Sequence, residues 1–367
     1  MKVECVKDKL KEGVAIAERV SGRNLTLPIL SAILLETGNK VLIIKSTNLE
    51  VGVEIEIPAK IDEAGSVTVS ASILNNFLAN LNKEIKVELT TINDNLQIIT
   101  ENTSTLIKSL NTEDFPIIPK INQDNGFSIN SALLAEGLKA VAFAAALSDI
   151  KPEISSVYIY GKDNELFFVA TDSFRLVEKK INIDNKIKDP ISLIVPLKSV
   201  TEIIRTIEGL YTNLMVSFNK NQLAINTDNL YLTLRIIDGA YPDYKQIIPT
   251  SFNTELNLKK EELSNILKLS NIFTDKFNQI DIEIKPKSNT LEINSHNQEV
   301  GENKFSIITK IKGEPLAISF NAKYLIDCLP SIESGDVNLR FTDKNHPLLI
   351  SGTGEDSFSY IVMPINK

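Results

Sequence analysis

"LFFVATDSFRLVEKKI" (residues 166–181) decides the fold, because the chain contains two further versions of it. An earlier stretch, VLIIKSTNLEVGVEIEI (41–57), and a later one, TLEINSHNQEVGENKF (290–305), follow the same plan. In each, apolar strand residues lead into a small hydroxyl residue that a polar residue follows. The hydroxyl residues are Thr47, Thr171 and Ser295, and both spacings are 124 residues. So regular a spacing indicates an internal threefold repeat.

Predicted helices recur at the same interval. The stretches SASILNNFLANL (70–81), PLKSVTEIIRTI (196–207) and NAKYLIDCLPSI (321–332) each place apolar residues on one helical face. Their helices align at residues 71, 196 and 321, with spacings of 125 residues. A further helix is expected near the start of each copy, at 6–20, 131–147 and 259–269. Each copy is much longer than a solenoid repeat and therefore predicts a domain with its own core.

The strands alternate between apolar and polar residues. Residues 51, 53, 55 and 57 are apolar, as are residues 230, 232, 234 and 236. This period of two is typical of antiparallel sheets with one buried face. We therefore expect an α+β protein of three similar domains, each with two helices packed on antiparallel sheets. The expected domains are 1–122, 123–250 and 251–367; the alternative is three unrelated α+β domains of similar size.

Composition excludes several classes of function. The net charge of −8 argues against a surface that binds nucleic acid everywhere. Two histidines and two distant cysteines make a zinc site or a histidine-based triad improbable, and no phosphate-binding glycine motif is present. We therefore expect no metal and no cofactor. The charged N-terminus and the lack of a long apolar run predict a cytoplasmic protein without membrane contact.

Several motifs together resemble one family. They are TLPILSAILLE (26–36), STNLEVGVE (46–54), EDFPIIP (113–119), VATDSFRL (169–176), DGAYPDY (238–244), SFNAKYLIDCL (319–329) and the tail YIVMPINK (360–367). They resemble the β sliding clamp, the processivity subunit of bacterial DNA polymerase III, over the whole chain. The resemblance implies a DNA clamp fold and a head-to-tail dimeric ring of six domains, with helices lining the hole and duplex DNA inside it. A ring retains DNA by topology, so an acidic protein can serve.

The resemblance also implies a non-enzymatic role with partners. A hydrophobic cleft would bind short peptides of the DNA polymerase III catalytic subunit, the clamp loader and other replication and repair proteins. Mapped by motif, the cleft would comprise Ile154, Thr171, Ser173, Phe174, Arg175, Leu176, Pro242, Ile247, Asn321, Tyr324, Val362, Met363, Pro364 and Ile365. The aliphatic residues and the methionine suit leucine-type anchors, and the arginine offers a planar fork to a carbonyl or carboxylate. Two departures from the family pattern are the bulky Phe174 and the polar pair Asn366-Lys367.

Contacts with DNA and with a second subunit are implied as well. Arg23 matches a basic position after the first helix, and Lys198 and Arg205 lie seven residues apart on one helical face. Lys139 is a further candidate, although each of these could be an ordinary surface charge. For ring closure, Ile272 and Phe273 would meet Leu106 and Ile107 of the partner's first domain. These four residues could instead belong to the cores of their own domains.

Other interpretations remain open at this stage. Asp172 could merely cap a turn, with Arg175 exposed beside it. An enzyme that uses this pair on an acidic substrate is a second class of function, but the sequence supplies no base, nucleophile partner, metal set or phosphate loop for it. A monomeric peptide-binding adaptor without a ring is a third class, and the oligomeric state separates it from a clamp.

Overall fold

The computed structural model describes the chain except for residues 23–26, 82–84, 122–125, 149, 185–186, 188–189 and 366–367. Internal contacts divide the chain into two compact units. The first unit comprises Met1–Ala135 and Lys198–Asp238, and the second comprises Glu136–Leu197 and Gly239–Lys367. The three sequence repeats are thus organised as two packed bodies.

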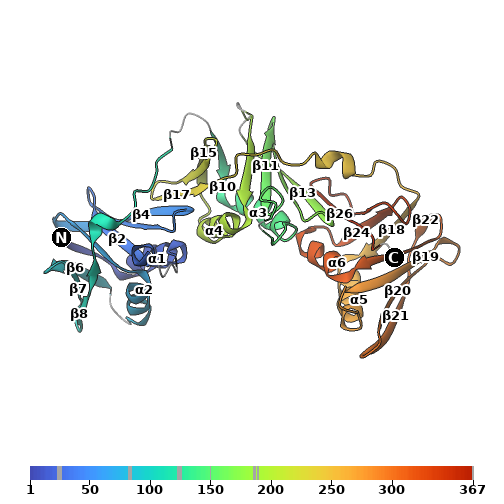
Figure 1. Ribbon diagram of the computed structural model, residues 1–367, viewed down its shortest axis with the longest axis horizontal. Coiled ribbons are helices and arrows are strands. Elements are labelled where there is room, and N and C mark those ends of the chain that lie inside the picture. Colours follow the sequence, from blue (N-terminus) through green and yellow to red (C-terminus); the bar gives the residue numbers. More distant parts are fainter. Residues whose placement is uncertain are drawn as a thin grey trace. The chain divides into compact units, whose positions relative to one another are not determined.

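The first unit contains one antiparallel sheet. Its main path runs β10-β15-β16-β17-β4-β1-β6-β7-β8, and β2, β3, β5 and β9 extend it from β4 (Figure 1). The strands are β1 (Lys2–Val6), β2 (Ala32–Thr37), β3 (Val41–Thr47), β4 (Val51–Glu63), β5 (Ser66–Ser70), β6 (Lys86–Ile92), β7 (Asn95–Ile99), β8 (Ser104–Ile107), β9 (Ser109–Leu110), β10 (Gly126–Asn130), β15 (Asn213–Phe218), β16 (Gln222–Asn226) and β17 (Leu230–Arg235).

The second unit contains two antiparallel sheets, ordered β14-β11-β12-β13-β26-β25-β24-β18-β22 and β21-β20-β19-β23. The strands are β11 (Ser156–Lys162), β12 (Glu165–Thr171), β13 (Arg175–Asn182), β14 (Ser192–Pro196), β18 (Thr254–Lys259), β19 (Gln279–Lys285), β20 (Thr290–Asn297), β21 (Gly301–Ile308), β22 (Ile311–Gly313), β23 (Leu316–Asn321), β24 (Asp336–Phe341), β25 (Leu348–Gly352) and β26 (Phe358–Val362). The predicted alternation holds, since the apolar residues of β4 and β17 are buried.

Six α-helices lie in the described part of the chain, two in each repeat. They are α1 (Lys7–Val20), α2 (Ala71–Asn80), α3 (Ser131–Ala142), α4 (Leu197–Ile207), α5 (Lys260–Ile272) and α6 (Ala322–Cys328). The sequence predicted all six. Helix α3 ends five residues before its predicted end at residue 147. Helix α6 ends two residues before Pro330 because a proline cannot continue an α-helix. Short 3-10 helices are η1 (Pro28–Ser31), η2 (Thr112–Asp114), η3 (Tyr244–Ile247), η4 (Pro286–Ser288) and η5 (Leu329–Ser331).

Glycines allow the first helix of two repeats to approach its sheet closely. A Cβ on Gly13 of α1 would lie 2.7 Å from Cδ1 of Ile44 in β3. A Cβ on Gly137 of α3 would lie 2.4 Å from a ring carbon of the fully buried Phe168 in β12. The two glycines are 124 residues apart, so the close packing of helix on sheet repeats with the sequence.

Two pairs of strands join successive repeats. The third strand between the helices of the first repeat, β4, pairs with β17, the last strand of the second repeat, over five residue pairs that include Val53 and Leu232. The equivalent strand of the second repeat, β13, pairs with β26, the last strand of the third repeat, also over five pairs. We call these two pairings the repeat junctions. The third repeat contains the equivalent strand β21, which pairs only with β20 among the described residues.

Candidate functional site

The turn between β12 and β13 is built by its own side chains. Oγ1 of Thr171 donates to the carbonyl of Arg175 at 2.7 Å. Oδ1 of Asp172 accepts from the backbone N–H groups of Phe174 and Arg175, both at 3.0 Å. Ser173 has a positive φ of 77°, a conformation that the flanking hydrogen bonds hold in place. Asp172 therefore caps this turn, as one of the alternative interpretations expected.

The side chain of Arg175 is largely covered and not exposed, contrary to that same interpretation. Its side chain is 11% exposed, and its guanidinium donates to Oδ2 of Asp172 at 3.0 Å, to Oδ2 of Asp327 at 2.7 Å and to the carbonyl of Phe143 at 2.8 Å. Burial alone lowers the pKa of Arg175, but the hydrogen bond to Asp327 and the charge of Asp172 outweigh it and raise the pKa. The planar fork is thus satisfied by acceptors of its own chain.

The C-terminal segment runs alongside this turn. The backbone N–H of Met363 donates to the carbonyl of Phe174 at 2.8 Å, and that of Ile365 donates to the carbonyl of Ser319 at 2.8 Å. Val362 pairs with Arg175 in the repeat junction and is fully buried. Asn366 and Lys367, the polar pair singled out in the sequence, lie outside the described residues.

Helix α6 contributes a second side of the site. Asn321 is the N-cap of α6, and its Oδ1 accepts from the backbone N–H groups of Lys323 and Tyr324 at 2.9 and 3.4 Å. The guanidinium carbon of Arg175 lies 4.4 Å from the centre of the Tyr324 ring. The hydroxyl of Tyr360 donates to the Tyr324 carbonyl at 2.9 Å. These contacts bring residues about 150 positions apart into one cluster.

Most of the predicted peptide-binding residues therefore lie together in the second unit. Of the four exposed ones, three are apolar and only Ser173 is polar. Phe174 and Ile247 are 61% and 51% exposed, and Pro242 is exposed beside Ile247 and η3. Leu176 is buried in a cluster with Tyr244 of η3. Ile154 lies in the segment after α3, where its carbonyl accepts from the N–H of Ala146. We call this set of fourteen predicted residues the candidate peptide site.

A buried lysine beside the site escaped sequence reasoning. Lys179 in β13 is 2% exposed, and its Nζ lies 2.7 Å from Glu333, 3.1 Å from Glu136 and 3.9 Å from Glu355. The hydrogen bond from Lys179 lowers the pKa of Glu333. A signal existed: Lys179 occupies an inward position between Val177 and Ile181, where strand alternation calls for an apolar residue.

The basic residues predicted to contact DNA lie in different parts of the structure. Arg23 lies outside the described residues. Lys139 on α3 is exposed in the second unit, and Lys198 and Arg205 are exposed on α4 in the first unit. Nη1 of Arg19, in the last turn of α1, donates to the carbonyl of Arg205 at 3.3 Å. Arg19 thus joins Arg205 in a basic pair that the sequence did not reveal, because the two residues are 186 positions apart.

The predicted interface residues differ in exposure. Leu106 on β8 is 51% exposed and Ile272 at the end of α5 is 59% exposed, whereas Phe273 is partly buried. Ile107 is only 4% exposed and packs in the core of its own domain, because successive side chains of β8 point to opposite faces of the sheet. Both β8 and β21 are terminal strands of their sheets.

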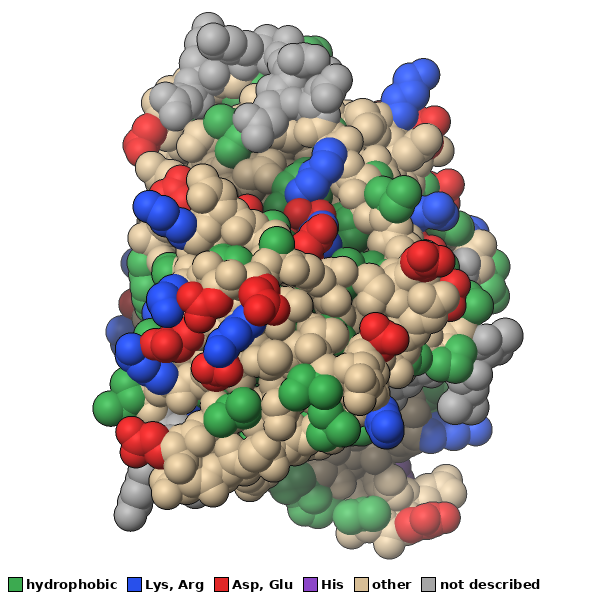
Figure 2. All heavy atoms as spheres, turned by 90° about the vertical axis from the view of Figure 1, so that its left-hand side faces the viewer, with side chains coloured by type: hydrophobic (Ala, Val, Ile, Leu, Met, Phe, Trp, Pro, Cys, Tyr) green, Lys and Arg blue, Asp and Glu red, His purple; other side chains and the backbone are tan. Residues whose placement is uncertain are grey.

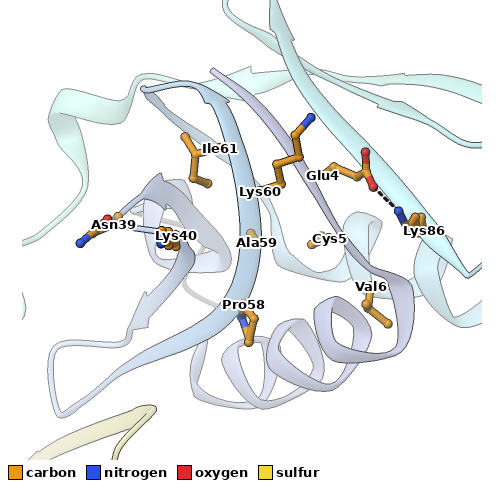
Figure 3. A pocket seen from close by; sticks show the side chains of 11 residues that line it. Glu4, Cys5, Val6, Asn39, Lys40, Pro58, Ala59, Lys60, Ile61 and Lys86 are labelled. Atoms are coloured by element: carbon orange, nitrogen blue, oxygen red, sulfur yellow. Dashed lines mark hydrogen bonds and ion pairs between the residues drawn. The ribbon is translucent and has the colours of Figure 1, made fainter.

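A separate hollow lies in the first unit. It has a volume of about 720 Å³ and lies along β1 and β4 (Figure 3). Two of the three lysines that line it are in ion pairs, Lys86 with Glu4 at 2.6 Å and Lys60 with Asp62 at 3.1 Å. The hydrogen bond from Lys86 lowers the pKa of Glu4. These are ordinary surface ion pairs and give the hollow no catalytic group.

One face of the molecule carries both signs of charge. Figure 2 shows Lys or Arg and Asp or Glu side chains next to one another, with hydrophobic side chains between them. Such a mixture provides no continuous basic surface for a polyanion. Within the described ranges, no cluster of three or more His, Cys, Asp or Glu residues could hold a metal ion. None of the helices described is long and apolar enough to cross a membrane.

Three repeats of one α+β unit, joined through shared sheets, define the three-domain DNA clamp fold. Solved structures agree: the chain superimposes on the DNA polymerase III beta subunit of Thermotoga maritima with a TM-score of 0.92, at 27% identity, covering 100% of this chain and 99% of that one. The beta sliding clamps of Synechococcus elongatus and a Synechocystis strain are 26% and 27% identical over 374 and 387 residues. In both cases 100% of this chain and 99% of the relative are covered.

The family models match all three repeats. The N-terminal, central and C-terminal domain models of the DNA polymerase III beta subunit match residues 1–119, 128–243 and 245–366. The chain belongs to the DNA polymerase III beta subunit family. It is a sliding clamp, a non-catalytic processivity factor of DNA replication. The predicted family, fold class and function are thereby confirmed, and the enzyme alternative is removed.

Proposed function

We propose that two copies of this chain close head to tail into a ring around duplex DNA, and the repeat junctions carry this proposal. In the first and second repeats, the equivalent strands β4 and β13 pair with the last strand of the next repeat, β17 and β26. The third repeat has β21 in the same place. In the first repeat β8 follows β6 and β7 as β17 follows β15 and β16, and it lies at the end of its sheet. Pairing of β21 with β8 of a second copy repeats the same junction and closes a ring of six domains.

The properties of these two strands support the proposed closure. An unpaired edge strand exposes backbone N–H and C=O groups that another chain can satisfy. Leu106 on β8 and Ile272 near β21 add exposed apolar side chains, as a heterologous contact requires. Phe273 contributes its accessible part, whereas the buried Ile107 supports the interface from within the first domain. The domain division at 1–122, 123–250 and 251–367 is part of the same proposal.

DNA would be retained by topology with few phosphate contacts. Arg19, Lys198 and Arg205 lie on α1 and α4, and Lys139 lies on α3; with Arg23, they are our candidates for transient contact with the phosphates. Few contacts imply weak, salt-sensitive binding that permits sliding. An acidic chain of net charge −8 can then serve, because the closed ring and not the charge prevents escape.

The candidate peptide site would recruit the partners. We assign to it short peptides of the DNA polymerase III catalytic subunit, the clamp loader and other replication and repair proteins. Exposed Phe174, Pro242 and Ile247 would receive aliphatic anchors. Arg175 acts as a positioning residue, since its donors hold the turn and α6 together instead of reaching for a ligand. The protein would work in the cytoplasm, where bacterial DNA is replicated.

A loading experiment tests the ring. Purified protein is loaded onto nicked circular plasmid with a compatible clamp loader and ATP, and is then separated on a sizing column before and after the plasmid is linearised. Retention on the circle and loss after cutting would support topological linkage. Equal retention on both forms would mean ordinary DNA binding and would overturn the proposal. Loss from both, with the loader active on a control clamp, would favour the adaptor.

A further inference from the structure

The turn between β3 and β4 in the first repeat has the same hydrogen bonds as the turn of the candidate peptide site. Oγ1 of Thr47 donates to the carbonyl of Val51 at 2.9 Å, and Oδ1 of Asn48 accepts from the two backbone N–H groups that close the turn, at 3.0 and 2.8 Å. Leu49 has a φ of 76°, compared with 77° for Ser173. This turn is therefore the counterpart, 124 residues earlier, of the turn between β12 and β13.

The segments around the two turns correspond as well. The N–H of Arg235, at the end of β17, donates to the carbonyl of Glu50 at 2.9 Å, and the N–H of Met363 donates to the carbonyl of Phe174 at 2.8 Å. A backbone hydrogen bond that follows the first helix also recurs 124 residues later, from Gly22 to Leu30 at 2.8 Å and from Ala146 to Ile154 at 2.9 Å. The first repeat junction thus has the same local framework as the second.

The linker that follows the first repeat supplies a further counterpart. Its sequence PIIP (116–119) corresponds to QIIP (246–249), which follows the second repeat. Ile117 is therefore the counterpart of Ile247, a residue of the candidate peptide site. Ile117 is 94% exposed, more than its counterpart at 51%.

This linker lies along the first repeat junction. A Cβ on Gly52 would lie 3.0 Å from Cγ2 of Ile118, and Nζ of Lys120 lies 2.5 Å from Oε2 of Glu54. The linker therefore runs parallel to β4, and the residues that precede Ile118 lie toward the turn that holds Leu49. All these segments belong to the first unit.

The surface formed by the turn, the linker and the strand end combines apolar and charged side chains. Leu49 is 51% exposed beside the still more exposed Ile117. Glu50 and Arg235 are exposed too, and neither forms an ion pair or a side-chain hydrogen bond with another described residue. They stand where the candidate peptide site has an aromatic ring and a methionine. The two surfaces therefore share a framework but differ in the ligand that they suit.

We infer that Leu49, Glu50, Ile117 and Arg235 form a second docking surface, which we call the first-junction site. It binds an extended peptide segment in which an aliphatic side chain lies between a basic and an acidic residue. The aliphatic side chain covers the two apolar residues, while the flanking charges pair with Glu50 and Arg235. The choice of a peptide as ligand rests on the proposed peptide function, through the correspondence of the two turns.

The test uses full-length protein with ¹³C-labelled leucine and isoleucine methyl groups. Ile117 reports on the first-junction site and Ile247 on the candidate peptide site, and each signal is assigned by substitution with serine. A blocked Lys-Leu-Leu-Asp peptide that carries a nitroxide is titrated in. We expect broadening of the Leu49 and Ile117 signals, but not of the signal of Ile85, which is 76% exposed elsewhere in the same unit. No broadening at Leu49 and Ile117, or equal broadening at Ile85, would overturn the inference.

Variants test the recognition chemistry. Leu49→Asn introduces a residue that tolerates positive φ, and Ile117→Ser changes an exposed position, so thermal stability should be unchanged in both. The affinity of the first-junction site should fall roughly tenfold in each, since each removes an apolar anchor contact. Ile85→Ser is the matched control and should bind as the wild type does. Unchanged affinity in both Leu49→Asn and Ile117→Ser would refute the site.

A neutral peptide tests the role of the charges. Blocked Gln-Leu-Leu-Asn should bind the first-junction site about threefold to tenfold more weakly than Lys-Leu-Leu-Asp, because charge-assisted hydrogen bonds are lost. Arg235→Gln should reduce this difference. Equal affinity of the two peptides for the wild-type protein would contradict the selection of charged flanks.

Phe174→Ala separates the two sites. In this variant any broadening at Ile247 should weaken, whereas that at Ile117 should persist. Broadening at Ile117 without broadening at Ile247 in the wild type would support the first-junction site and count against the proposed peptide function. Broadening at Ile247 alone would overturn the first-junction site and leave the proposed function standing.

Discussion

Nη1 of Arg175 lies 2.7 Å from Oδ2 of Asp327, although the two residues are 152 positions apart. The pair fastens α6 to the turn before β13, and the same guanidinium holds Asp172 and the Phe143 carbonyl. Two segments that carry predicted peptide-binding residues are therefore positioned by one arginine. The consequences of this arrangement can be measured.

Asp327→Ala should lower both stability and peptide affinity. Asp327 is 41% exposed, so solvent screens the pair, and we expect a loss of about 1 kcal/mol in the free energy of unfolding. Affinity for a leucine-anchored peptide should fall about threefold to tenfold, because the turn 171–175 loses a constraint. Urea unfolding and calorimetry measure the two effects. Lys259→Ala, which breaks the more exposed pair with Asp336, is the control and should change neither quantity appreciably.

Lys179→Met should destabilise the protein by about 2–4 kcal/mol, since it leaves three carboxylates without their shared cation. The matched substitution Lys180→Met removes a partly exposed pair with Glu165 and should cost less than about 1 kcal/mol. Similar losses in the two variants would contradict the special role of Lys179.

The contribution of Lys179 should also depend on pH. The pKa of Glu333 is lowered from its ordinary value of 4.5, so its stabilisation is present above that value and is lost as the pH falls through the lowered pKa. The pKa of Lys179 is raised from 10.5, so its stabilisation is complete below 10.5 and is lost as the pH rises through the raised pKa. The stability difference between wild type and Lys179→Met should therefore be constant near neutrality and shrink below about pH 4.5. A difference that stayed constant down to pH 3 would exclude this linkage.

Leu106→Lys should open the proposed ring. Burying a lysine charge at this apolar head-to-tail contact is less favourable than the contact itself is stabilising, so the dimer should dissociate. The 40.7 kDa chain should then sediment as a monomer with its fold intact. Ile85→Lys places the same charge on another exposed apolar residue and should leave the dimer unchanged. A dimeric Leu106→Lys protein would place the interface elsewhere.

Phe174→Ala should weaken peptide binding about tenfold without altering stability by more than about 0.5 kcal/mol. The ring is 61% exposed and its backbone carbonyl, which accepts from Met363, is retained in the variant. Phe277→Ala removes a ring of similar exposure and serves as the control in the same calorimetric titration. A tighter complex would instead show that Phe174 obstructs the site.

Arg19→Glu and Arg205→Glu should each make DNA binding less dependent on salt. The slope of the logarithm of the DNA-binding constant against log[salt] should become smaller in magnitude by about one in each variant. Arg235→Glu, an exposed strand residue, should leave the slope unchanged. Fluorescence anisotropy on short duplexes between 50 and 200 mM salt measures it. Identical slopes in all three variants would remove these arginines from the DNA-facing surface.

The elements of this fold were readable from the sequence because their signals are local. The alternation along 51–57 and the helical spacing in 196–207 can be recognised from neighbouring residues alone. The 124-residue period then allowed the elements predicted in each copy to be compared with those in the other two. The role of Arg175 was not readable, since its acceptors lie 32 and 152 positions away. The same holds for the contact between Arg19 and Arg205. Whether Ile107 is buried depends on which residues of β8 face the core. A strand of four residues is too short for that face to be predicted from the alternation of apolar and polar residues.

The two repeat junctions bear on how such a protein can change over evolutionary time. Each joins neighbouring copies through five matched residue pairs, so β4 needs β17 and β13 needs β26 to complete their sheets. Exchange of the second copy by recombination would have to preserve the register on both of its sides at once, and its deletion would leave β4 and β26 without their partners. The copies are therefore free to diverge in sequence, as Thr171-Asp172 and Ser295-His296 have done, but not to be shuffled or lost.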